Sequence, residues 1–240
     1  MLSKSTAPTT EPVTISEAKA HLRVDENVAE EDELIAAYIA AAREYCEGFQ
    51  NRAYITQTWE LWLDSFPDKD YIEIPLPPLQ EPSVTAGAFV TGTVYRILTV
   101  GTTNFTLIGA AASTVGTVFT ATGAGSGTGT ATASGILKYY DTTDTVAYMS
   151  GADLFLDIKS EPGRICLGYG KSWPSATLRP ANGVCVTFTA GYGTASSVPN
   201  VVKAAMKLLI GDYYEAREAG TASKTTIEAV ERLLWLQRCF

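Results

Sequence analysis

The sequence is poor in the side chains that most enzymes use: its 240 residues include one histidine, His21, and four widely spaced cysteines. A catalytic triad needs a base and an orienting group together, and no Gly-x-Ser-x-Gly turn accompanies the histidine. The cysteines form no Cys-x-x-Cys pair, which is typical of reduced thiols rather than of metal ligands. We expect no catalytic, cofactor-binding or metal-binding residue, no cofactor and no enzymatic activity.

Basic residues are also in deficit, since 18 Lys and Arg stand against 26 Asp and Glu, for a net charge of −8. Nucleic-acid binding needs clustered basic side chains, and the sequence has no clear basic stripe. No apolar run approaches the roughly 18 residues of a membrane span. Residues 1–12 lack the apolar stretch of a signal peptide, so we expect folding in the cytoplasm and no membrane partner.

Residues 85–134 lack charge almost entirely: Arg96 stands alone among nine glycines and fourteen threonines. This break in composition at both ends predicts a separate all-β insert. We expect short strands at 95–97, 105–107 and 115–119 and a flexible closing segment at 123–130. The predicted unit is a small sandwich or barrel, and low-complexity disorder is the alternative.

Helical periodicity and capping signals predict four helices outside the insert. Thr14 and Glu17 form a capping box at the first, and acidic residues lead into the second. Pro199 suits the first turn of the third helix. The expected helices span about 14–24, 31–50, 199–219 and 226–238.

Period-two alternation predicts strands between these helices, including a hairpin of 136–141 and 145–149. The expected fold class is α+β: a helical bundle-like core with antiparallel β hairpins or sheet, interrupted by a small all-β insert. The expected organisation is a flexible N-terminal arm at 1–12, a discontinuous core domain at 13–84 plus 135–240, and the Gly/Thr-rich β insert at 85–134.

Apolar residues at two places in the sequence exceed what a core needs. The last helix and tail are apolar on all sides, and Trp62 falls on the polar face of its strand. Apolar surface of this kind commonly docks on a partner. We therefore expect contacts to another protein at Trp62 and at Leu233, Leu234, Trp235, Leu236 and Phe240, and a core role for the C-terminal residues is the alternative.

Several segments in the same order resemble the head–tail connector (adaptor, or head-completion) proteins of tailed bacteriophages. One of them is Val186-Thr-Phe-Thr-Ala-Gly-Tyr-Gly193. The others are 12–24, 41–48, 55–61, 74–79, 160–165, 169–174 and 198–199. The insert departs from the short connection usual in that family, and parts of it resemble a small segment met in assorted phage structural proteins.

The resemblance implies a virion neck protein that assembles in the bacterial host cytoplasm. It implies a ring of identical subunits, dodecameric, under the portal protein. Such a ring extends the DNA channel, lets packaged DNA pass without specific binding, and offers a docking surface to the next head-completion, stopper or tail protein. A receptor- or carbohydrate-binding virion module carried by the insert is the alternative, for which Phe89, Tyr95, Phe105 and Phe119 are the available aromatic residues.

Overall fold

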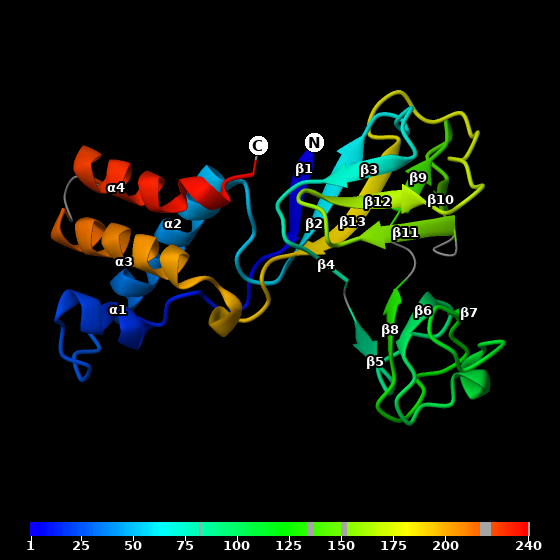
Figure 1. Ribbon diagram of the computed structural model, residues 1–240, viewed down its shortest axis with the longest axis horizontal. Helices are drawn as coiled ribbons and strands as arrows, with labels where there is room; N and C mark the ends of the chain where they lie inside the picture. Colours follow the sequence, from blue (N-terminus) through cyan, green and yellow to red (C-terminus); the bar gives the residue numbers. More distant parts are fainter. Residues whose placement is uncertain (82, 134–136, 150–152, 217–221, 240) are drawn as a thin grey trace. The chain divides into compact units, whose positions relative to one another are not determined.

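The computed structural model describes residues 1–81, 83–133, 137–149, 153–216 and 222–239 (Figure 1). Its helices and antiparallel sheets confirm the predicted α+β class. By their contacts the residues divide into two compact units, each described separately below. The β-rich unit comprises Met1–Ser5, Thr58–Ile74 and Leu79–Thr189, and the helical unit comprises Thr6–Gln57, Pro75–Pro78 and Ala190–Phe240. Within the described ranges, every helix is too short or too polar to cross a membrane.

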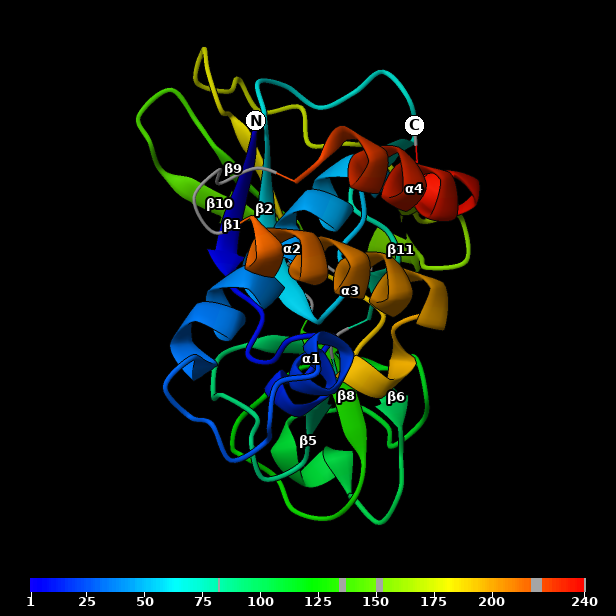
Figure 2. The same cartoon turned by 90° about the vertical axis from the view of Figure 1, so that its left-hand side faces the viewer.

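The helical unit is built around a long second helix. Its helices are α1 (Ile15–Leu22), α2 (Asp32–Gln50), α3 (Asn200–Glu215) and α4 (Lys224–Leu234), and the 3-10 turn η4 (Trp235–Gln237) follows. Helix α3 packs against α2 and α4, while α1 packs against α2 and α3 (Figure 2). Their apolar stripes meet in one core, to which Ile35, Ile39, Met206, Leu209 and Val230 contribute.

Local capping sets the helix boundaries. The predicted capping box is confirmed: the Glu17 N–H donates to Thr14 Oγ1 at 3.1 Å, and the Thr14 N–H donates to Glu17 Oε2 at 2.9 Å. The fourth helix begins two residues earlier than predicted, because Ser223 Oγ accepts the Thr226 N–H at 3.2 Å. It also ends earlier, at Leu234. The last residues predicted for the third helix, 217–219, lie outside the described residues.

The β-rich unit contains two antiparallel sheets besides the insert. One has the order β1 (Leu2–Thr6), β2 (Gln57–Leu63), β13 (Val184–Ala190), β9 (Leu137–Tyr140) and β10 (Val146–Tyr148), with β4 (Leu79–Gln80) also paired to β13. The other has the order β11 (Leu154–Asp157), β12 (Gly163–Leu167) and β3 (Tyr71–Ile74). The predicted hairpin at 136–149 is confirmed by β9 and β10, although its first residue lies outside the described residues.

The expectation of a flexible arm at 1–12 is wrong for its first half. Met1 and Trp62 exchange two backbone hydrogen bonds, of 2.7 and 2.8 Å, so β1 forms the edge of the five-strand order. At the far end of the arm, Arg43 Nε donates to Glu11 Oε2 at 2.8 Å. A Thr/Ser/Pro-rich composition favours disorder in isolation. An open strand edge outweighs it here, because edge N–H and C=O groups need partners.

The insert has a sheet of its own with the order β5 (Val84–Thr85), β8 (Thr130–Ala133), β6 (Val94–Thr99) and β7 (Val118–Thr120). Its aromatic side chains form a compact core, with Phe89 centred 4.9 Å from Tyr95 and 5.9 Å from Phe105. The four aromatic residues that a carbohydrate-binding surface would use, Phe89, Tyr95, Phe105 and Phe119, are all buried in it. This burial counts against the alternative function.

Two expectations for the insert are wrong. Residues 105–107 form part of a 3-10 turn, η1 (Phe105–Ile108), rather than a strand, because Asn104 Oδ1 accepts the Thr106 N–H at 3.2 Å and caps the turn. The closing segment is packed rather than flexible. A Cβ atom on Gly129 would lie 2.4 Å from the Val100 carbonyl oxygen, so the glycines of this run allow close backbone approach.

Candidate interaction surfaces

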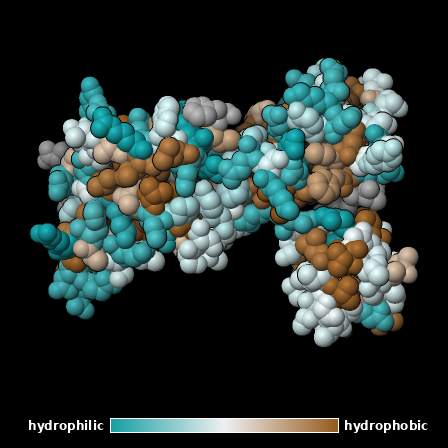
Figure 3. All heavy atoms as spheres, in the orientation of Figure 1, coloured by the Kyte–Doolittle hydropathy of each residue, from teal (hydrophilic) through white to brown (hydrophobic). Residues whose placement is uncertain are grey.

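The end of α4 and the η4 turn present large apolar side chains to solvent. Trp235 is 55% exposed, Leu236 93% and Leu233 39%. On the face drawn in Figure 3, apolar residues gather over α3 and α4. Trp235 and Leu236 border a hollow of about 360 Å³ whose other walls are Glu228, Glu231 and Arg232. We call Leu233, Trp235 and Leu236 the C-terminal patch.

Leu234, which was predicted to be one of these contacts, does not belong to the patch. Its side chain is fully buried in the helical core. The apolar residues of α4 and η4 lie on all sides of the helix, so one of them faces inward while its neighbours face outward. Phe240, the remaining predicted contact, lies outside the described residues.

The backbone beneath the patch is fixed by the end of α2. Gln50 Nε2 donates to the Leu234 carbonyl at 2.7 Å, and Asn51 Nδ2 donates to the Cys239 carbonyl at 3.0 Å. Arg52 Nε donates to the carbonyl of Gln237. The Cys239 N–H in turn donates to the Gln50 carbonyl at 2.9 Å. We call these four bonds the tail clamp.

Side chains add to the clamp. The Trp235 ring lies 6.5 Å from that of Phe49, and the Arg238 guanidinium lies 4.7 Å over the Phe49 ring. Tyr45 Oη donates to Glu231 Oε1 at 3.0 Å; burial and this carboxylate raise the pKa of Tyr45 to about 12. The sequence gives no sign of the clamp, because its donors and acceptors lie about 180 positions apart.

Trp62 lies on a second, more polar surface. Its ring stacks on Tyr140 at 5.8 Å, and the Lys138 ammonium lies 5.3 Å from its centre. The Arg179 guanidinium covers Tyr140 at 4.1 Å. Because the ring is half-buried by these neighbours in its own sheet, it offers a partner less surface than the C-terminal patch does. Its role as a contact stays a prediction.

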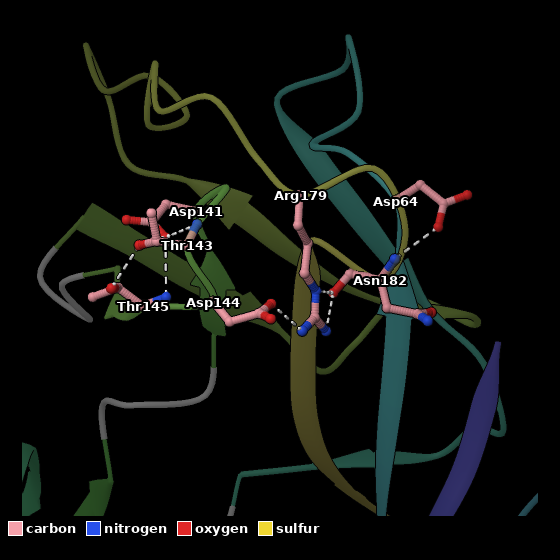
Figure 4. A network of polar contacts seen from close by, with 7 residues as sticks. All are labelled: Asp64, Asp141, Thr143, Asp144, Thr145, Arg179 and Asn182. Atoms are coloured by element: carbon pink, nitrogen blue, oxygen red, sulfur yellow. Dashed lines mark hydrogen bonds and ion pairs between the residues drawn. The ribbon is translucent and has the colours of Figure 1, made fainter.

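A polar network fixes Arg179 at the tip of the β9–β10 hairpin (Figure 4). Arg179 Nη1 donates to Asp144 Oδ1 at 3.1 Å, while its Nε and Nη2 donate to the Asn182 carbonyl. The Asn182 N–H reaches Asp64 Oδ1 at 2.9 Å. Asp141 Oδ1 accepts from Thr143 and Thr145, and the Thr143 bonds lower the pKa of the Asp141 carboxyl below its usual value. The carboxylates of Asp141 and Asp144 therefore stabilise the turn of the β9–β10 hairpin.

An apolar groove of about 580 Å³ lies within the helical unit. Its wall combines the end of the arm, α1, α2 and the segment before α3. The residues that line it are Thr10, Glu11, Val13, Thr14, Ile15, Ala36, Ile39, Thr194, Ala195 and Ser196. The sequence gives no sign of this groove, because residues 1–12, which form part of its wall, were predicted to be a flexible arm.

His21 is exposed on α1, near Gly211 of α3. Across the part of the chain that the structure describes, no three His, Cys, Asp or Glu side chains gather closely enough to hold a metal ion. Cys46 and Cys185 are buried, and burial raises the pKa of each thiol, to about 12 and about 11. A high pKa keeps both thiols protonated, which makes them poor nucleophiles.

Comparison with known proteins gives a family match for residues 12–81 and a fold for the whole chain. Residues 12–81 match the model of the family described as "Phage gp6-like head-tail connector protein". A chain of the "Neck of empty GTA particle computed with C6 symmetry" has 22% identity and a TM-score of 0.63, with 100% of this chain and 96% of that chain covered. No curated protein sequence matches.

Two further structures give the same coverage. A chain of the "Virion of native gene transfer agent (GTA) particle" has 21% identity and a TM-score of 0.62. A chain of the "Neck of native GTA particle computed with C12 symmetry" has 21% identity and a TM-score of 0.58. At these identities the likeness shows the fold. The family match covers residues 12–81, and it agrees with the resemblance found in that part of the sequence.

Proposed function

We propose that the chain is one subunit of a ring in the neck of a virion, between the portal protein and the next head-completion or tail protein. The observation that carries this proposal is the fold shared with neck chains over 100% of the sequence. The C12 symmetry of one of those necks supports a dodecamer. The role is structural, and the ring performs no chemistry.

The C-terminal patch is the surface best suited to hold the portal protein or a neighbouring subunit. Large aromatic and aliphatic side chains that become buried at the centre of an interface supply most of its binding energy. Trp235 and Leu236 supply such surface, and the tail clamp holds their backbone in place before binding. Pre-ordering lowers the entropic cost of association.

The net charge of −8 fits a channel through which DNA slides. An acidic surface repels phosphate and gives the polymer no site at which to stop. In this proposal packaged DNA passes through the ring without specific binding. The insert folds as a module of its own and projects from the outer side of the ring.

The test is assembly with the cognate portal protein. Light scattering of the purified chain, alone and mixed with portal, measures the mass of any complex, and cryo-electron microscopy of that complex locates the ring. We expect a portal-bound ring with twelvefold symmetry. Failure of the chain to join the portal under conditions in which both proteins are folded would contradict the proposal.

A further inference from the structure

The β1 strand is attached to its sheet mainly through its backbone. The side chains of Leu2, Lys4, Ser5 and Thr6 are exposed, and Ser3 is half-buried. Among its side chains, the Lys4 ammonium lies 5.0 Å over the Trp59 ring, and Leu2 is 36% exposed. A strand without buried side chains contributes little to a core, so it can leave without opening one.

The register of β1 on β2 follows from two contacts. Met1 and Trp62 exchange both of their backbone hydrogen bonds, which is the pattern of a directly opposed antiparallel pair. Three residues further along, Lys4 faces Trp59, as that register requires. Leu2 therefore stands opposite Leu61 in a non-hydrogen-bonded pair.

A short exposed linker joins β1 to the helical unit. Residues 7–10 follow the strand, and Glu11 is then anchored to Arg43 at 2.8 Å. Pro8 fixes its own φ and favours extended backbone at Ala7, and the chain then bends at Thr9 and Thr10. From Thr6 to Glu11 it reaches roughly 17 Å at full extension.

We propose that this strand is exchanged between neighbouring subunits of the ring, so that β1 of one copy completes the sheet of the next at its β2 edge. The inference rests on the proposed ring. Exchange of an identical element keeps every contact of the closed chain and changes only the linker, which makes it a low-cost way to join copies. Short connecting segments favour it.

When β1 leaves its own sheet, it opens the edge of β2, and β1 of another copy fits that edge. Without β1, the β2 strand presents unpaired N–H and C=O groups beside Trp59 and Leu61, and such edges recruit strands. The strand that fits is β1 itself, whose Lys4 matches Trp59. In a ring, each subunit gives one strand and receives one, so every edge is closed.

Cysteine pairs test the exchange in full-length protein. Chains with Leu2→Cys and chains with Leu61→Cys are mixed, assembled on the cognate portal protein and oxidised. A disulfide between them joins two chains, and non-hydrogen-bonded strand pairs bring Cα atoms to about 4.5 Å, close enough for that bond. We expect a covalent dimer on a non-reducing gel. The double variant Leu2→Cys/Leu61→Cys should give a ladder of multimers up to the mass of the ring.

The matched control replaces Leu2→Cys by Ser3→Cys, whose side chain points to the other face of the same strand and should give no dimer. Each single variant alone measures the background from the native cysteines. If either leucine variant fails to fold, Lys4→Cys mixed with Trp59→Cys tests the same register.

The outcomes separate the two proposals. Intact portal-bound rings in which the double variant forms its disulfide within one chain would overturn the exchange and leave the ring in place. Absence of any ring with folded wild-type protein would overturn the proposed function, and the exchange with it.

Discussion

Leu234, the last residue of α4, and Leu236, in the η4 turn, should respond in opposite ways to the same substitution. Leu234 is 0% exposed in the helical core, whereas Leu236 is 93% exposed. Leu234→Ala removes buried methyl groups and leaves a cavity, so it should destabilise the helical unit by about 2–5 kcal/mol. Leu236→Ala removes surface that water already covers, and the stability should stay within about 0.5 kcal/mol of wild type.

Binding to portal should give a different order. Leu236→Asp places a charge in the C-terminal patch, where a central contact contributes about 2 kcal/mol or more, equivalent to a roughly 30-fold loss of affinity. Leu234→Ala should bind normally at temperatures where it remains folded, because its side chain is buried away from the partner. Urea unfolding followed by far-ultraviolet circular dichroism measures the first effect, and co-sedimentation with portal measures the second.

Two results would refute this reasoning. If Leu236→Ala destabilises the chain as much as Leu234→Ala does, the tail is core and the patch does not exist. If Leu236→Asp is as stable as wild type and sediments with portal at wild-type affinity, the anchor lies elsewhere on the chain.

Three further predictions concern the β-rich unit. Replacing 86–133 by a short Gly/Ser linker should leave a folded, cooperatively unfolding protein, since loop-closure entropy changes slowly with length; a broad, non-cooperative melt would contradict an independent insert. Gly129→Ala should unfold the insert because its Cβ would meet the Val100 carbonyl, whereas Gly123→Ala, with open space at that position, should not; near-ultraviolet circular dichroism of the insert's aromatic core distinguishes the two. Hydrogen bonds from Ser160 and Arg164 hold the pKa of Asp157 well below its usual range. Asp157→Asn should therefore destabilise the chain at neutral pH, and the difference from wild type should shrink as the pH falls below about 3.8, where the carboxyl of the unfolded chain becomes protonated; a pH-independent difference in urea midpoint would be inconsistent with this cause.

Features set by neighbouring residues were predictable from the sequence. The Thr14–Glu17 capping box and the long stripe of α2 depend on spacings of three and four residues, and both occur where the pattern placed them. The same holds for the β9–β10 hairpin, whose turn lies between two alternating segments. The absence of charge in 85–134 likewise predicted residues that form a sheet and core of their own.

Features that depend on distant partners were not predictable. Composition alone cannot tell that residues 1–6 have an open strand edge available 61 positions away. Nor can it tell which of four consecutive apolar residues at 233–236 faces inward, because the tail clamp comes from α2. In the insert, the spacing of Phe105 resembled a strand, yet one capping bond from Asn104 was enough to favour a 3-10 turn.

The tail clamp fixes the backbone that carries the few anchor side chains. Gln50, Asn51 and Arg52 are consecutive, and Asn51 adopts a left-handed conformation with φ of 52° that ends α2. The helix therefore ends where its side chains meet the tail carbonyls. The entropy lost in ordering the tail is offset during folding by these bonds, so a partner meets side chains on a fixed backbone. Gln50→Ala should weaken portal binding even though Gln50 is itself buried and touches no partner, because Trp235 and Leu236 would then have to be ordered on binding. Unchanged portal affinity in a folded Gln50→Ala variant would show that the clamp serves stability alone.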